Sequence, residues 1–422
     1  MVLYKNAAAA KVSNLRSRGE GAFDSQAVLL LAVQWLAAIG HALSGTFVPV
    51  YLWKASQSYM LIGWYALGQY AIGGLTFWIA GKWVKEHNKM NSLRLGIVLS
   101  GSFYLTVLLL GQQARFYSLP LGMLSGMGLG FYWLAYNVVY FEITEPDNRD
   151  RFNGWAGLLG STAGMIAPWV SGYLITTMSG ERGYKLIFTL SLVIFAITVI
   201  LSFWLVKRKN TGNRYEWTYG YRQLAERGNP WRKMFAAIVA QGVREGVFMF
   251  LVGLIVYIAT QDESRLGSYT LITSFVALVS FWFVGKRLKP SNRKAAMLLG
   301  TVMLGAVILP LFTKVTYITL LVFGIGTSLF LPLYIIPITS RVFDLIGQSE
   351  KSAAMREELI VLREAGLIIG RLIGLSAYLI LLPLNHSTTA IVWLMFAVGI
   401  VPIAGWWFLR SLFNQHKAIH SK

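Results

Sequence analysis

The chain has 422 residues and a formal net charge of +20, yet 55% of its residues are hydrophobic and only 13% are charged. A water-soluble fold would be left with too little polar surface, so this composition excludes an ordinary soluble domain. The sequence has no cysteine, which excludes disulfides, thiolate catalysis and cysteine-ligated metal sites. The basic residues lie in short loops between long apolar runs, so the positive charge indicates a membrane protein and not a nucleic-acid-binding one.

Long apolar runs, separated by charged or turn-rich breaks, predict membrane-spanning helices along nearly the whole chain. A hydrocarbon core of about 30 Å takes roughly 20 helical residues to cross, and the runs have this length. We expect spans near residues 27–53, 59–81, 94–113, 117–142, 152–178, 185–206, 234–260, 266–285, 295–313, 316–340, 357–382 and 388–412. The sequence therefore predicts an all-α membrane protein with twelve transmembrane helices in two pseudo-symmetric six-helix bundles.

The same runs divide the chain into five parts. These parts are an N-terminal tail (1–26), a first bundle (27–206), a basic linker (207–233), a second bundle (234–413) and a C-terminal tail (414–422). Most Lys and Arg residues fall in the tails, the linker and alternate loops, which by the positive-inside rule predicts a multi-pass plasma-membrane protein with both termini in the cytoplasm. The linker interleaves basic and aromatic residues, as expected for a segment lying along anionic lipids of the inner leaflet.

A short internal repeat supports the division into two halves. The segment after the second span, which begins at Gly81 and includes Lys85, aligns with the segment after the eighth span, which begins at Gly285 and includes Lys289. The alignment continues in the same register into the following helix, which chance seldom produces. Repeated halves of this kind are typical of secondary transporters.

Two six-helix halves, cytoplasmic termini, a basic central loop and a Gly-x-x-x-basic turn repeated after spans 2 and 8 together resemble the major facilitator superfamily. The loop after the fourth span looks like that family's acidic-Pro-Arg-Gly turn, at Glu142, Arg149, Arg151 and Gly154. The resemblance implies alternating-access transport, with these turns in gating or structural roles. The chain departs from the family at Lys85, where an Asp is usual, and at Ala167, where proton-coupled drug antiporters have Gly. The fourth span also lacks the buried Arg of those antiporters.

Ionisable residues inside the spans are the sharpest functional signal. Each costs at least about 2.5–3.5 kcal/mol at the bilayer centre and therefore needs a partner or a water-filled cavity. Arg244 and Glu245 lie midway along the seventh span, and Arg363, Glu364 and Arg371 lie in the eleventh. An arginine here could hold a substrate carboxylate or phosphate, and a glutamate could take up and release a proton. The alternative is a structural network that pairs Glu245 with Arg371 and Glu364 with Arg244.

Polar and aromatic side chains on other spans are candidates for substrate contact. The candidates are Gln34, His41, Tyr132, Trp133, Tyr136, Asn137, Gln241 and Tyr334. Tyr132 and Tyr136 share a helix face, and an aromatic, hydrogen-bonding wall suits an amphipathic or ring-bearing ligand. Helix packing alone is the competing explanation, because glycines at positions 122, 126 and 130 of the same span have a spacing that lets two helices approach closely.

Several function classes lack their usual motifs. The sequence contains no phosphate-cradling Gly-rich loop, no metal-spaced His or acidic cluster and no nucleophile elbow, so we expect neither a cofactor nor a metal nor enzymatic activity. The leading hypothesis is a secondary transporter of a small or amphipathic solute, with proton-coupled efflux as one form of it. The alternatives are a flippase for an amphipathic lipid or polyprenyl carrier, and a non-transporting sensor or membrane-embedded enzyme on a transporter scaffold.

Overall fold

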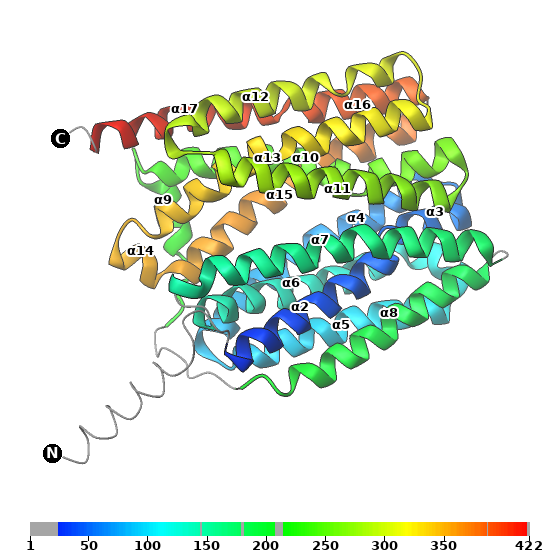
Figure 1. Ribbon diagram of the computed structural model, residues 1–422, viewed down its shortest axis with the longest axis horizontal. Coiled ribbons are helices and arrows are strands. Elements are labelled where there is room, and N and C mark those ends of the chain that lie inside the picture. The colour runs from blue at the N-terminus through cyan, green and yellow to red at the C-terminus, as the bar shows by residue number, and fades with distance from the viewer. Residues whose placement is uncertain (1–23, 144–145, 179–180, 207–213, 386, 420–422) are drawn as a thin grey trace.

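The computed structural model of the chain describes residues 24–143, 146–178, 181–206, 214–385 and 387–419. These residues form helices with short connections, and no strand occurs among them. Figure 1 shows two groups of helices side by side, one made of α2 to α8 and the other of α10 to α17. This arrangement confirms the prediction of an all-helical fold in two halves.

The first half contains seven helices and one 3-10 turn. They are α2 (Ser25–Gly45), α3 (Val48–Ser56), α4 (Tyr59–Glu86), α5 (Lys89–Leu110), η1 (Gly111–Tyr117), α6 (Ser118–Ile143), α7 (Pro146–Thr177) and α8 (Glu181–Ser202). The predicted first span is divided between α2 and α3. Pro49 lies in the first turn of α3, where its missing N–H has no intrahelical partner to lose, so the chain restarts a helix there.

The second half repeats this pattern of long helices. They are α10 (Pro230–Thr260), α11 (Glu263–Arg287), α12 (Arg293–Ala306), α13 (Tyr317–Ile346), α15 (Arg356–Leu384), α16 (Thr388–Ile400) and α17 (Pro402–Ile419). Short elements connect them: α9 (Tyr219–Ala225), η2 (Pro290–Asn292), η3 (Leu309–Phe312) and α14 (Glu350–Ala354).

Ten segments of the described chain are long and apolar enough to cross a membrane. One of them, Lys89–Tyr140, contains both α5 and α6, and the 28-residue helix α4 is outside the ten. The total of twelve spans therefore stays a prediction, while a multi-pass helical membrane fold is confirmed.

Glycines bring the backbones of paired helices into direct contact. A Cβ at Gly122 of α6 would lie 2.0 Å from the Tyr65 carbonyl oxygen, and a Cβ at Gly126 would lie 2.4 Å from the Gln69 carbonyl oxygen. The close approach predicted from the glycine spacing of the fourth span is thus confirmed, with α4 as the partner helix. In the second half, Gly246 of α10 likewise allows the backbone of α15 to approach closely.

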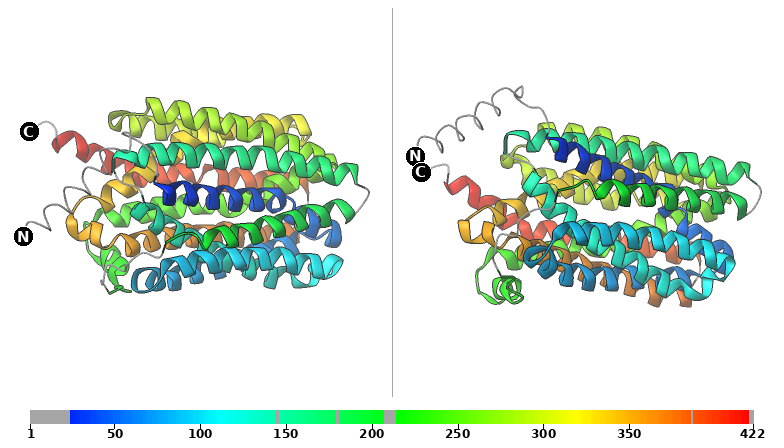
Figure 2. Two further views of the ribbon diagram at one scale, coloured as in Figure 1. Left: turned by 60° about the horizontal axis from the view of Figure 1, so that its bottom comes forward. Right: turned by 90° about the horizontal axis from the view of Figure 1, so that it is seen from below.

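The two ends of the molecule differ in their connections. Figures 1 and 2 place α9 and α14 at one end and α3 at the opposite end. We call the end with α9 and α14 the linker end, and the end with α3 and the α10–α11 turn at Gln261 the far end.

Candidate functional site

Three hollows share the Met249 side chain in their lining, and we call them together the central cavity. The first hollow, of about 460 Å³, is lined mostly by α2, α4, α5 and α6, and the third, of about 370 Å³, by α10 and α13. The second, of about 450 Å³, is lined by both halves. Met249 lines all three, so the hollows are continuous with one another in their lining. Each has the size of a small-molecule site.

An ion network lies in the second hollow. The Arg371 Nη2 is 2.9 Å from the Glu245 Oε2, and its Nη1 is 2.9 Å from the Glu364 Oε1. The three side chains are between 18% and 23% exposed, so water reaches them. Gln241 donates a hydrogen bond of 2.7 Å to Glu245, and the Arg371 guanidinium lies 5.9 Å from the centre of the Tyr70 ring of the first half.

Helix packing explains why this network forms. Gln241 and Glu245 are one turn apart on α10 and share a face, so the amide reaches the carboxylate. A Cβ at Gly246 would lie 2.3 Å from the Arg371 carbonyl oxygen, so α10 and α15 touch at this level. This close packing of the two helices brings the glutamate of one beside the arginine of the other.

The structure confirms the expected ion pair of Glu245 with Arg371, but the expected pair of Glu364 with Arg244 is wrong. Glu245 pairs with Arg371, but Glu364 also pairs with Arg371 and not with Arg244. Arg244 lines the third hollow together with Glu245 but makes no ion pair with it among the described residues, and its guanidinium lies over the Phe248 ring, 4.4 Å from its centre. Arg363 lines the second hollow, and within the described ranges no ion pair or hydrogen bond is found for it.

The candidates of the first half fall into cavity-lining and packing residues. Trp133 is 44% exposed and lines the first and second hollows, and Asn137 lines the second. Tyr132 lines the first hollow, whereas Tyr136 stacks behind it with ring centres 6.0 Å apart and donates a hydrogen bond to Gln34. The predicted aromatic wall therefore consists of a cavity-facing layer and a supporting one.

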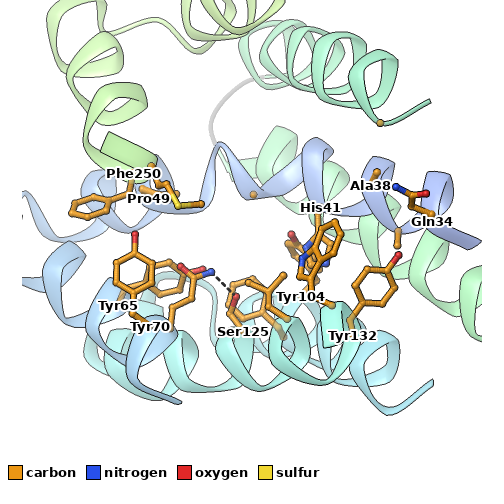
Figure 3. Close-up of a pocket in the computed structure, with 18 residues that line it drawn as sticks. Gln34, Ala38, His41, Pro49, Tyr65, Tyr70, Tyr104, Ser125, Tyr132 and Phe250 are labelled. Atoms are coloured by element: carbon orange, nitrogen blue, oxygen red, sulfur yellow. Dashed lines mark hydrogen bonds between the residues drawn. The ribbon is translucent and has the colours of Figure 1, made fainter. Parts of the chain in front are cut away.

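His41 and Tyr334 are both deeply placed. Figure 3 shows His41 beside Tyr104 in the first hollow, and its ring also packs on Phe195 with centres 4.8 Å apart. Its Nε2 is buried, and no hydrogen-bond partner occurs for it in the described residues. Tyr334 of α13 lines the third hollow, with its hydroxyl next to Gly405 of α17.

The sequence analysis missed the contribution of α4. Tyr65, Gln69 and Tyr70 line the first hollow, and Gln69 donates a 3.2 Å hydrogen bond to Ser125 of α6 (Figure 3). The signal that could have revealed them is Gln69 itself, an amide in the middle of an apolar span with tyrosines one position and four positions away.

Gly81 and Lys85, which were expected in a turn after the second span, lie instead in the last turns of α4 and contact the second half. The Lys85 Nζ is 2.6 Å from the Glu358 Oε1 of α15, and both side chains are at most 2% exposed. The same carboxylate accepts a hydrogen bond from the Glu216 backbone N–H. A Cβ at Gly81 would lie 2.9 Å from the Tyr215 hydroxyl, and burial, followed by the charge of Glu358, raises the pKa of Tyr215. The linker thus covers this junction.

The equivalent residues of the repeat are Gly285, inside the last turn of α11, and Lys289, just after it, and they lie in open surroundings. A Cβ at Gly285 would meet no atom within 4 Å, and Lys289 is exposed. Gly154 likewise faces open space. The side chains of the other turn residues, Glu142, Arg149 and Arg151, lie outside the described part of the chain.

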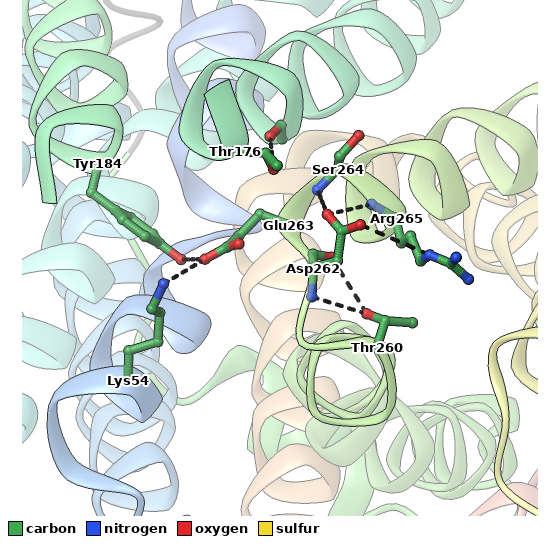
Figure 4. Close-up of polar contacts among 9 residues, drawn as sticks. Lys54, Thr176, Tyr184, Thr260, Asp262, Glu263, Ser264 and Arg265 are labelled. Atoms are coloured by element: carbon green, nitrogen blue, oxygen red, sulfur yellow. Dashed lines mark hydrogen bonds and ion pairs between the residues drawn. The ribbon is translucent and has the colours of Figure 1, made fainter. Parts of the chain in front are cut away.

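A second inter-half ion pair lies at the far end. The Lys54 Nζ of α3 is 2.8 Å from the Glu263 Oε1 of α11, and the Tyr184 hydroxyl of α8 donates a 2.9 Å hydrogen bond to the same oxygen (Figure 4). The sequence places Lys54 in the loop between the first two predicted spans. It could not predict the ion pair, because nothing near Lys54 in the sequence indicates that α11 begins beside it.

Comparisons with known proteins agree with this architecture. An uncharacterized protein of Bacillus subtilis, YqgE, is 38% identical over 391 residues, which cover 92% of this chain and 90% of that protein. A bacterial homologue of the iron transporter ferroportin in an outward-facing state shares the fold with a TM-score of 0.67, at 16% identity over 93% of this chain and all of that one. The human organic anion transporter MFSD10 (TETRAN) shares it with a TM-score of 0.64, at 12% identity over 92% of this chain and 100% of that chain.

A family model described as Major Facilitator Superfamily matches residues 30–356. That match covers more than half of the chain, including helices of both halves and the linker between them. The resemblance noted from the turns after spans 2, 4 and 8 is therefore confirmed. The chain belongs to the major facilitator superfamily of membrane transporters.

Proposed function

We propose that this protein is a secondary active transporter that moves a small amphipathic solute by alternating access and couples that movement to protons. The observation that supports this proposal is the network of Arg371, Glu245 and Glu364 in a water-accessible hollow lined by both halves. A purely structural ion network would be expected away from water. All three side chains of this network belong to the second half, but each is 18–23% exposed, and Arg371 lies over Tyr70 of the other half.

The network has the properties of a proton-linked switch. One arginine holds two carboxylates, so protonating either glutamate leaves Arg371 paired with the other and changes the net charge of the cavity by one. Partial exposure gives protons access, and burial makes the charge change costly enough to affect which conformation is favoured. Loss of a proton on one side and uptake on the other would link the conformational cycle to a proton gradient.

The dimensions and chemistry of the cavity favour a small solute. Each hollow, at 370–460 Å³, has the size of a site for one small organic molecule. Within the described residues, no group of three or more His, Asp or Glu side chains is arranged to hold a metal ion. The cavity therefore offers little to an iron-like cargo, in spite of the fold shared with the ferroportin homologue. By the positive-inside rule, the linker end would face the cytoplasm.

Reconstituted vesicles test this function. Purified protein in liposomes would be given an imposed pH gradient, and movement of ethidium, D-xylose, naphthalene-2-sulfonate and a fluorescent phospholipid would be followed. We expect movement of at least one soluble probe to depend on the gradient and to be lost in Glu245→Gln and Glu364→Gln. Glu350→Gln, at an exposed site in α14, is the matched control. Gradient-driven movement at the wild-type rate in both cavity variants would contradict the coupling, and movement of the phospholipid alone would favour a flippase.

A further inference from the structure

We propose that the solute is an organic anion with an apolar ring body, and that Arg244 binds its anionic group. This inference rests on the transport function proposed above and adds the class of substrate. It follows from the charges that line the central cavity, from the surroundings of Arg244 and from the side chains of the third hollow.

The lining of the central cavity carries an excess positive charge. Its charged members among the described residues are three arginines and two glutamates: Arg244, Arg363, Arg371, Glu245 and Glu364. Both glutamates bind Arg371, so these three side chains together carry one negative charge, and the two remaining arginines give the lining a net charge of +1. Arg244 and Arg363 are left without an acidic partner in the part of the chain that the structure describes. Protonation of a glutamate would increase this excess.

Arg244 is the more exceptional of the two. It is 5% exposed, and its Nε and Nη2 have no hydrogen-bond partner among the described residues. Its guanidinium instead lies over the Phe248 ring. A buried cation without partners is strongly unfavourable. A lysine could lose its proton to avoid the charge, but an arginine stays charged, so this site calls for an anion from outside the chain.

The side chains around Arg244 indicate what the rest of the ligand looks like. The third hollow is lined by Gln241, Arg244, Glu245, Phe248, Met249, Leu331, Tyr334 and Ile335. Five of these eight side chains are apolar or aromatic, and two of the polar ones, Gln241 and Glu245, already bond to each other, so a sugar would find few free hydrogen-bonding groups. A cation would be repelled by Arg244, because Glu245 is already paired with Arg371. An aromatic or aliphatic body with one anionic group fits both the walls and the charge.

Arg363 gives the anion a first contact on its way in. It lies two turns closer to the linker end than Arg371 on the same helix and lines the second hollow, which adjoins the third. The side chain is only partly buried, so its charge is more accessible than that of Arg244. An anion entering from the linker end would meet Arg363 before reaching Arg244, and charges placed in sequence along a cavity speed such entry.

A binding experiment on the purified full-length protein in detergent tests this inference. The probe is naphthalene-2-sulfonate, which stays anionic at all working pH values, and its neutral control is naphthalene-2-sulfonamide. We expect the sulfonate, but not the sulfonamide, to raise the thermal unfolding midpoint of the wild type. Arg244→Gln should weaken sulfonate binding at least about tenfold. Arg363→Gln should weaken it less, and Arg287→Gln, at an exposed site on α11, should leave it unchanged.

The ligand-free variants separate a binding role from a structural one. If Arg244 served the fold, Arg244→Gln would lower the unfolding midpoint without ligand; as an unpaired buried charge, its removal should leave the midpoint unchanged or raise it. Arg244→Lys keeps the charge without the planar fork and should retain part of the affinity. Equal affinity for sulfonate and sulfonamide, no binding of sulfonate to the wild type, or unchanged binding in Arg244→Gln would each overturn the proposal.

The outcomes also distinguish this inference from the transport proposal. Sulfonate binding that depends on Arg244, without any movement driven by a pH gradient, would keep the anion site and remove the proton coupling. Gradient-driven movement of ethidium or D-xylose, with no sulfonate binding, would keep the transporter and remove the anion site.

Discussion

The two seams where the halves meet are related by the internal repeat, yet they are built differently. In the α4–α15 seam the helices pack along their whole length. Cβ atoms at Gly63, Gly74 and Gly81 of α4 would lie 2.3 Å, 2.7 Å and 3.0 Å from side chains of α15. The buried pair of Lys85 and Glu358 closes this seam at the linker end.

The closest contacts of the α7–α11 seam lie toward the far end. A Cβ at Gly172 of α7 would lie 2.4 Å from the Glu263 carbonyl oxygen, and the Ser274 hydroxyl is 3.4 Å from the Gly164 carbonyl oxygen. Toward the linker end, Cβ atoms at Gly157, Gly160 and Gly164 would meet no atom within 4 Å, so α11 does not approach these glycines as closely as it approaches Gly172.

The difference indicates how the molecule opens. Helices that touch along their full length and share a buried ion pair act as a pivot, while helices that touch at one end can separate at the other. We infer that the central cavity opens at the linker end through the α7–α11 seam. The far end is held by Lys54 and Glu263. Four predictions test this comparison.

The largest effect is expected at the closed seam. Glu358→Ala leaves Lys85 buried without its counter-charge and removes the acceptor for the Glu216 N–H. Loss of one partner of a buried pair costs about 3–5 kcal/mol, so the free energy of unfolding in detergent should fall by about that amount.

Two further variants control this result. Lys85→Met/Glu358→Gln removes both charges and keeps an oxygen for the Glu216 N–H, so it should recover most of the stability. Glu350→Ala, at an exposed site of α14, should change little. If Glu358→Ala unfolds like the wild type, the ion pair does not hold the seam.

The same substitution at two positions of α7 should have opposite effects. Gly172→Ala places a methyl group against the backbone of α11 and should cost about 1–3 kcal/mol. Gly157→Ala has open space and should stabilise the helix by up to about 1 kcal/mol. Thermal unfolding of both variants measures the contrast, and equal midpoints would mean that the α7–α11 seam is uniform along its length.

The described part of the linker, from residue 214 on, packs on the α4–α15 seam. Trp217 packs on Trp78 of α4 with ring centres 4.4 Å apart, and an aromatic pair of this kind contributes about 0.5–1.5 kcal/mol. Trp217→Ala should therefore lower the unfolding midpoint modestly. Trp282→Ala, an exposed tryptophan on α11, is the matched control and should have a smaller effect. A larger loss in the control would assign the stabilising role to the other seam.

The smallest effect on stability is expected at the far end. Lys54 is 41% exposed and Glu263 9%, so their ion pair is partly solvated and contributes at most about 1 kcal/mol. Lys54→Gln should shift the equilibrium between the two conformations toward the one that is open at the far end. We expect the equilibrium constant to change by a factor of about five or less.

Spin-label distances can detect that shift, because the natural chain has no cysteine to compete with introduced ones. Labels at Gly157→Cys and Leu278→Cys report on the linker end of the α7–α11 seam, and labels at Lys82→Cys and Ala353→Cys report on the α4–α15 side. In Lys54→Gln we expect the first distance to shorten and the second to stay constant. Movement of the second pair alone would reverse the assignment of pivot and opening.

Local signals in the sequence accounted for much of this structure. The glycines at 122, 126 and 130 predicted a close helix contact, because a helix face without side chains lets any neighbouring helix approach its backbone closely. Glu245, Glu364 and Arg371 were identified as site candidates because a charge in an apolar span needs a partner wherever it lies. Periodicity places Glu364 and Arg371 two turns apart on one face of the eleventh span, but it could not exclude Arg244 as the partner of Glu364, since that depends on how α10 is rotated against α15.

The sequence by itself determined the helical membrane fold, the two related halves and the presence of charges at their centre. These three features follow from the length of the apolar runs, the constant register of the internal repeat and the cost of burying a charge in lipid. Each of them can be recognised in a short stretch of sequence. Only the tertiary structure decided that Lys85 meets Glu358, that Lys54 meets Glu263 and that Arg244 is left without a partner. Those pairings join residues far apart in sequence, so they depend on how the two halves pack, and two equivalent turns of one repeat can end in different surroundings.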